Sequence, residues 1–176
     1  KFALQEQYKP QPKQYVSGET FYLQGRALRL KVIRASKEQL YSDGVHLFLE
    51  VKDPQDFSKK ERMVMRFFDR QCKEVFGEIV EELYPVFQKY GVAVPSLRIR
   101  SMDTRWGSCL PGKGVITLNK RLLEAPRNCI EYVVMHELCH FIHPNHSKHF
   151  YAFLSMLMPD WKERKKVLDA NDTYYL

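Results

Sequence analysis

A short segment in the C-terminal third of the chain combines two histidines and a glutamate at a spacing suited to metal chemistry: His136-Glu137-Leu138-Cys139-His140. On a helix, His136 and His140 stand one turn apart on the same face, with about 5–6 Å between their Cβ atoms. Two imidazoles placed in this way can reach one zinc ion. Glu137 is offset by one residue, where its carboxylate can take a proton from a water that the metal acidifies. The segment therefore predicts a catalytic zinc site with Glu137 as general base.

A catalytic zinc site needs a third protein ligand and one open position. Turn formers at 144–145 should reverse the chain, and His146 follows them directly. We therefore expect His136, His140 and His146 to hold one zinc ion per chain. A carboxylate from a later helix is the alternative, and Glu163 is the best placed of these.

The other histidines of this region and one cysteine have a less specific interpretation. His143 and His149 belong to a group of five histidines within residues 136–149. Either could bind metal, orient substrate or polarise an oxyanion, but we interpret both as solvated residues at helix ends. Cys139 has apolar neighbours on the helix, so we interpret it as a small core residue rather than a thiolate ligand.

The N-terminal third is predicted to form strands. Residues 1–14 are polar and indicate a loose arm. Residues 27–32 alternate between apolar and basic, which is typical of a half-exposed strand. Turn chemistry at 42–44 precedes a second strand at 45–51. We therefore expect a small antiparallel sheet over about residues 15–52.

A long helix is predicted after this sheet. Ser58 and Glu61 have the spacing of a capping box. Apolar residues then recur near helical spacing as far as Tyr90-Gly91, with Pro85 as a possible break.

The metal segment lies on the next predicted helix. Alternating residues first predict strands at 97–102 and 115–119. Pro126 then stands where proline favours a helix start, and the apolar positions predict an amphipathic helix that Pro144 ends. A last helical stretch begins near Ser147.

Size, composition and charge set broad limits. The 176 residues fit one domain or a domain with a small appendage, and 44% hydrophobic residues are ordinary for a globular protein. No apolar run approaches the roughly 18 residues of a membrane span, so no membrane partner is expected. The net charge of +7 favours acidic partners in general. The basic residues are scattered, however, so nucleic-acid binding is weakly supported.

Five short motifs, in this chain order, carry a family resemblance: Trp106–Cys109, Ile116–Asn119, Tyr132–His140, Asn145–Ser147 and Met158–Asp160. Together with the opening at 18–26, they resemble the YgjP-like bacterial metallopeptidases over about residues 15–170. The resemblance implies a small zincin related in design to the SprT-like proteases, with the same three histidines as ligands. SprT-like relatives act on proteins trapped on DNA, a role that does not transfer automatically because no added DNA-binding module is visible here.

Three further residues are candidates for contact with substrate. Trp106 and Asn119 match positions of the family's motifs. Trp106 could wall a substrate pocket or pack at a core edge, and Asn119 could line a cleft or close a turn. Arg105 could steady an oxyanion, although we do not expect it to.

The residue pattern and the resemblance together predict an α+β fold. It consists of an N-terminal arm with an antiparallel β-rich appendage (1–57) and a zincin-like metallopeptidase core (58–176). The expected activity is that of a zinc metalloendopeptidase acting on proteins or peptides. Two alternatives stay open: a zinc-binding scaffold with little or no turnover, and a nucleic-acid-associated module.

The cysteines give the first testable prediction. Cys72, Cys109, Cys129 and Cys139 form no Cys-x-x-Cys pair, and a chain of this length needs no disulfide framework. A cytoplasmic location with reduced thiols is therefore expected, and thiol titration of the denatured protein should find all four free. A disulfide in protein prepared from its native compartment would contradict both expectations.

Overall fold

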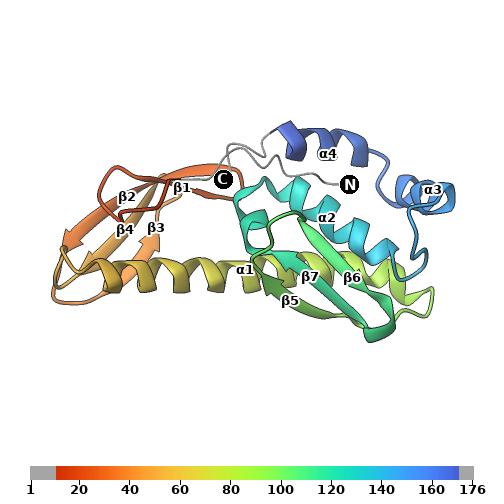
Figure 1. The fold of residues 1–176 in the computed structure, drawn as a ribbon, viewed down its shortest axis with the longest axis horizontal. Coiled ribbons are helices and arrows are strands. Elements are labelled where there is room, and N and C mark those ends of the chain that lie inside the picture. The colour runs from red at the N-terminus through yellow and green to blue at the C-terminus, as the bar shows by residue number, and fades with distance from the viewer. Residues whose placement is uncertain (1–10, 171–176) are drawn as a thin grey trace.

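One long helix links the two halves of the structure (Figure 1). The computed structural model describes residues 11–170, and the fold is α+β, with two small sheets and four α-helices in this part of the chain. The helices are α1 (Phe57–Gln88), α2 (Arg127–Cys139), α3 (Lys148–Leu157) and α4 (Trp161–Ala170). None of these described helices is both long and apolar enough to cross a membrane. Most of the arm predicted for residues 1–14 lies outside the described residues.

The first sheet has four strands in the order β1-β2-β4-β3. Its inner face is apolar because the strand residues alternate, so that Leu28 and Leu30 are buried while Arg29 and Lys31 are exposed. The strands are β1 (Thr20–Leu23), β2 (Arg26–Arg34), β3 (Gln39–Ser42) and β4 (His46–Val51).

The prediction that this sheet is antiparallel throughout was wrong. The two central strands, β2 and β4, run parallel, with Leu30 opposite Leu47. The sequence patterns identified these two strands. They missed the short strand β3, which lies between β2 and β4 in sequence and at the edge of the sheet. The chain turns back after β2, runs along β3 and reverses again at Asp43-Gly44, so β4 returns in the direction of β2.

The second sheet carries one wall of the cleft described below. Its order is β5-β7-β6, and β7 pairs parallel to β5 and antiparallel to β6. Strand β7 was predicted at its observed bounds, whereas β6 was not predicted. The strands are β5 (Ser96–Arg100), β6 (Gly107–Leu110) and β7 (Val115–Asn119).

Helix α1 packs against both halves. Near its start, Val64 joins the apolar cluster under the first sheet, and from Cys72 to Phe87 its buried residues join the larger C-terminal cluster. Pro85 does not interrupt the helix. The division of the chain at residues 57 and 58 stays a prediction, because α1 contributes to both clusters.

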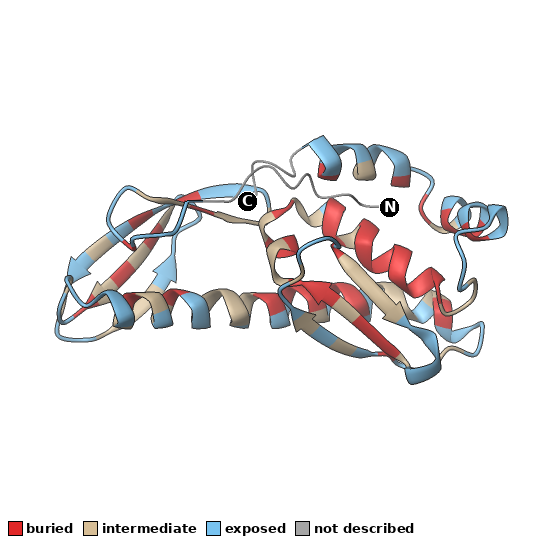
Figure 2. Ribbon diagram, in the orientation of Figure 1, coloured by how far each residue is buried: buried red, intermediate tan, exposed pale blue. Residues whose placement is uncertain are grey.

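Helix α2 is the most enclosed of the four described α-helices. Ten of its thirteen residues are buried, including His136 and Glu137, and Figure 2 shows it red along its length. The prediction of an amphipathic helix was therefore wrong, because α2 is covered by α1, α3, α4 and the second sheet. It also ends at Cys139, before the predicted stop at Pro144.

The start of α1 gives a stability prediction. The predicted capping box at Ser58 is not formed; instead the carboxylate of Asp56 accepts a hydrogen bond from the backbone N–H of Lys59 at 3.0 Å. Asp56→Ala should therefore lower the unfolding free energy by about 1 kcal/mol. The matched change Ser58→Ala should have almost no effect. If urea denaturation shows a larger loss of unfolding free energy for Ser58→Ala than for Asp56→Ala, the capping box at Ser58 is the correct interpretation.

Candidate metal centre

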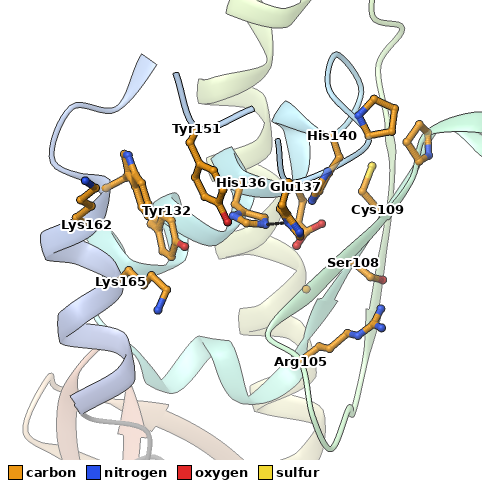
Figure 3. A pocket seen from close by; sticks show the side chains of 15 residues that line it. Arg105, Ser108, Cys109, Tyr132, His136, Glu137, His140, Tyr151, Lys162 and Lys165 are labelled. Atoms are coloured by element: carbon orange, nitrogen blue, oxygen red, sulfur yellow. Dashed lines mark hydrogen bonds between the residues drawn. The ribbon is translucent and has the colours of Figure 1, made fainter. Parts of the chain in front are cut away.

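Three histidines from two chain segments meet at one point. One ring nitrogen from each of His136, His140 and His146 lies within 4.8 Å of the others. The Nε2 atoms of His136 and His146 are 3.0 Å apart, as the dashed line in Figure 3 marks. Among residues 11–170, these are the histidine, cysteine or carboxylate groups close enough to share one metal ion.

The loop after α2 brings the third histidine back. His140 is the C-cap residue of α2, and its Nδ1 lies 3.2 Å from the carbonyl oxygen of His143. Because a carbonyl only accepts, Nδ1 must donate, which leaves the lone pair of Nε2 for a metal. The chain then turns, and the hydroxyl of Ser147 caps α3 by accepting a hydrogen bond from the N–H of Phe150. His146 lies between the hydrogen bond of His140 to His143 and the Ser147 cap, and both restrict its position.

One phenylalanine supports all three imidazoles. The ring of Phe150, which is fully buried, lies 4.9 Å from His136, 4.7 Å from His140 and 5.1 Å from His146 between centroids. The sequence analysis did not connect Phe150 with the metal site. Phe150 lies in the first turn of α3, whereas His146 precedes the N-cap of this helix, so no helical spacing indicated their contact.

His136 and His140 are buried and His146 is exposed, but desolvation favours the neutral form of all three imidazoles. It lowers the pKa of His136 to about 3 and also lowers the pKa of His140 and His146. A neutral imidazole has a free lone pair, so at neutral pH the group can bind a metal without first losing protons.

Glu137 lies beside the histidines and is 5% exposed. Burial raises the pKa of its carboxyl to about 8, and the charge of Arg105 opposes this shift. A Cβ atom on Gly107 would meet Glu137 Cγ and Val133 Cγ1 at 3.1 Å. The start of β6 can therefore approach the carboxylate only because residue 107 is a glycine.

These groups open into a cleft of about 650 Å³. One wall is formed by β6 and the residues next to it, and the other by α3 and α4 (Figure 3). Arg105, Gly107, Ser108, Cys109, Pro111, Tyr132, His136, Glu137, His140, Pro144, His146, Tyr151, Trp161, Lys162 and Lys165 line the cleft. Tyr132, Tyr151 and the α4 residues were not identified from sequence. Tyr151 and the α4 residues join the site only through the packing of α3 and α4, whereas the position of Tyr132 one turn before His136 on α2 was an available signal.

The structure does not bring Trp106 and Asn119 to the cleft. Trp106 is 2% exposed, with the Arg121 guanidinium 5.3 Å from its ring centroid. Asn119 is fully buried, and its Nδ2 donates to the carbonyl oxygens of Met102 and Arg105, both at 2.8 Å. Asn119 thereby holds the loop that carries Arg105.

The remaining candidates lie apart from the three histidines. Glu163 is exposed on α4, and Cys139 is fully buried in the apolar core. The rings of His143 and His149 stack on each other with centroids 6.4 Å apart, outside the group that could share a metal.

A neutral imidazole triad beside a buried carboxylate is a site for metal-assisted chemistry. The model of the YgjP-like metallopeptidase domain matches residues 2–171. The chain therefore belongs to the YgjP-like metallopeptidase family, which confirms the resemblance seen in its motifs.

Two solved structures are similar to part of the chain. One is the metallopeptidase zymogen abylysin of Pyrococcus abyssi, with 20% identity over 54% of this chain and 93% of that chain, at a TM-score of 0.48. The other is the metallopeptidase zymogen jannalysin of Methanocaldococcus jannaschii, with 22% identity, 52% and 84% coverage and a TM-score of 0.45. The comparison with curated proteins found no match.

The hydrogen bonds from Asn119 to the loop that carries Arg105 give the next prediction. Asn119→Ala removes both bonds to the loop and a bond from the backbone N–H of Arg121. Because buried groups are left unsatisfied, the unfolding free energy should fall by about 2–3 kcal/mol. Asn128→Ala, an exposed asparagine on α2, is the control and should change it by less than about 0.5 kcal/mol. Equal losses in denaturant titrations would contradict the structural role of Asn119.

Proposed function

We propose that this protein is a zinc-dependent metalloendopeptidase in which His136, His140 and His146 hold one zinc ion and Glu137 is the general base. The observation that carries the proposal is the meeting of three neutral imidazoles beside a buried carboxylate in an open cleft. A purely structural zinc site closes its coordination with four protein ligands and has no use for a base.

The donor set fits zinc. Three imidazole nitrogens with one position left open are a known catalytic ligand set for this ion. The hydrogen bond from His140 Nδ1 to the backbone orients that ring, as is usual for metal-binding histidines. When bound, zinc supplies Lewis acidity, which polarises the scissile carbonyl and makes water nucleophilic at neutral pH.

The chain's own residues supply the proton transfers. In its ionised form, which the charge of a bound zinc ion would favour, Glu137 takes the proton of the attacking water at its carboxylate and passes it to the departing amine. Gly107 lets the wall of the cleft lie against Glu137, and Val133 packs on the same glycine. This packing restricts the carboxylate to the side of the metal site.

The edge of β6 is proposed to align the substrate. Within the described sheet β6 pairs with β7 alone, and Ser108 and Cys109 line the cleft. An extended peptide can add to such an edge through backbone hydrogen bonds. Recognition through the backbone favours internal bonds of a protein or peptide, hence an endopeptidase.

The division into a zincin-like core and an appendage, and the cellular location, are also proposals. We assign residues 58–176 to a zincin-like core and residues 1–57 to an appendage, supported by the motif helix α2 packing on a sheet with a cleft-facing edge strand. The four free thiols support a reducing cytoplasm.

Metal content tests the ligand set. The purified protein should hold about one zinc per chain, His136→Ala and His140→Ala should abolish tight binding, and His146→Ala should weaken it strongly. His149→Ala and Glu163→Ala are matched controls that should keep wild-type zinc. If Glu163→Ala loses zinc and His146→Ala keeps it, the choice of third ligand is wrong.

Substitution of the base tests the chemistry. Glu137→Gln keeps the side-chain shape but cannot accept a proton, so it should retain zinc and lower the cleavage rate of an unfolded protein by about 10²–10⁴-fold. Glu163→Gln is the control for loss of a carboxylate. A Glu137→Gln variant as fast as the wild type would refute the mechanism, and a wild type that cleaves none of a broad panel would favour a zinc-binding scaffold.

A further inference from the structure

One wall of the cleft is both aromatic and basic, and the proposed proton transfers do not use it. Tyr132 of α2, Tyr151 of α3 and three residues of α4 (Trp161, Lys162 and Lys165) form this wall. We call these five residues the α4 wall. Figure 3 labels Tyr132, Tyr151, Lys162 and Lys165, and these lie on the side of the histidines away from β6.

The rings of the α4 wall connect directly to the metal centre. Tyr151 stacks against His146 with centroids 6.2 Å apart and against Trp161 at 5.5 Å. Trp161 also stacks on Tyr132 at 6.2 Å, and its indole N–H donates to the hydroxyl of Ser155. Trp161 and Tyr132 are nearly buried, so the wall is a fixed surface.

Two lysines on one face of α4 place positive charge along this surface. Lys162 and Lys165 are three residues apart, which puts them on the same side of the helix, and both line the cleft. The Lys162 Nζ lies 5.7 Å from the Trp161 ring centroid. The Lys165 Nζ is 2.6 Å from Asp169 Oδ2, in a pair that is 39% and 46% exposed. Such exposed pairs are weak, so a substrate carboxylate can share or replace this partner.

The charges of the whole cleft favour an anion. Besides the histidines, its acidic and basic side chains are the cations Arg105, Lys162 and Lys165 and the single carboxyl group of Glu137. Glu137 faces β6 at Gly107, on the wall opposite α4. An anionic group on the α4 wall therefore meets cations and aromatic rings rather than the catalytic carboxylate.

We propose that the α4 wall is a carboxylate-binding subsite, so that the enzyme prefers substrates with a carboxylate close to the bond that is cut. The proposal rests on the proposed function. The carboxylate comes from an aspartate or glutamate side chain or from the C-terminus of the substrate. Lys162 and Lys165 bind it, and the side-chain stem packs on Tyr151, the exposed ring of the wall.

Matched peptides test this subsite. The probes are fluorescent peptides of one neutral sequence with Glu, Gln or Lys at each position near the cleaved bond. Each is made with a C-terminal amide and with a free carboxylate, which separates the two sources. For the wild type, kcat/KM should favour Glu over Lys at one position by about tenfold. The preference should shrink as salt rises.

Lysine variants locate the effect. Lys162→Met and Lys165→Met keep the apolar stem and remove the charge, so each should reduce the Glu-to-Lys preference by about three- to fivefold. Lys166→Met, an exposed lysine of α4 that does not line the cleft, should leave the preference unchanged. A merely structural effect of these changes would lower all cleavage rates equally.

Binding to the Glu137→Gln variant separates this proposal from the proposed function. The same peptides should bind that variant with the same charge preference, measured by fluorescence anisotropy, whether or not any cleavage is found. Equal binding of Glu and Lys peptides, or a preference that survives in Lys162→Met and Lys165→Met, overturns the subsite. Absence of cleavage by the wild type, with the binding preference present, overturns the proposed function alone.

Discussion

The return of the chain from His140 to His146 is the constraint on which the site depends. It brings the Nε2 atom of exposed His146 to 3.0 Å from that of buried His136. Buried polar rings such as those of His136 and His140 are costly unless each nitrogen finds a partner. Phe150 packs on all three rings and the Ser147 cap fixes the start of α3, so the chain keeps the arrangement that a metal needs.

The surrounding elements follow from this arrangement. Helix α2 carries the first two histidines and is buried because α1, α3, α4 and the second sheet all pack on it. Gly107 lets β6 lie against Glu137, and Asn119 ties down the loop that carries Arg105. The metal site, the base and the cleft walls thus belong to the same packed core.

Sequence reasoning reached those features that local spacing encodes. The pair His136 and His140, the turn before His146 and the strand at 115–119 each depend on a few neighbouring residues. The parallel pairing of β2 with β4 was missed because it depends on β3, whose four residues have a weak pattern. Trp106 and Asn119 are buried away from the cleft because of tertiary packing, which no local pattern encodes. The same is true of the position of the basic α4 wall.

The most direct test of the metal centre is X-ray absorption at the zinc edge of the purified wild-type protein. Three imidazole nitrogens and one water oxygen should give a first shell at about 2.0–2.1 Å with imidazole scattering behind it. His146→Ala, if it retains zinc at high metal concentration, should lose one imidazole from this pattern. A sulfur shell at about 2.3 Å would contradict the assignment, because Cys109 or Cys139 would then bind the metal.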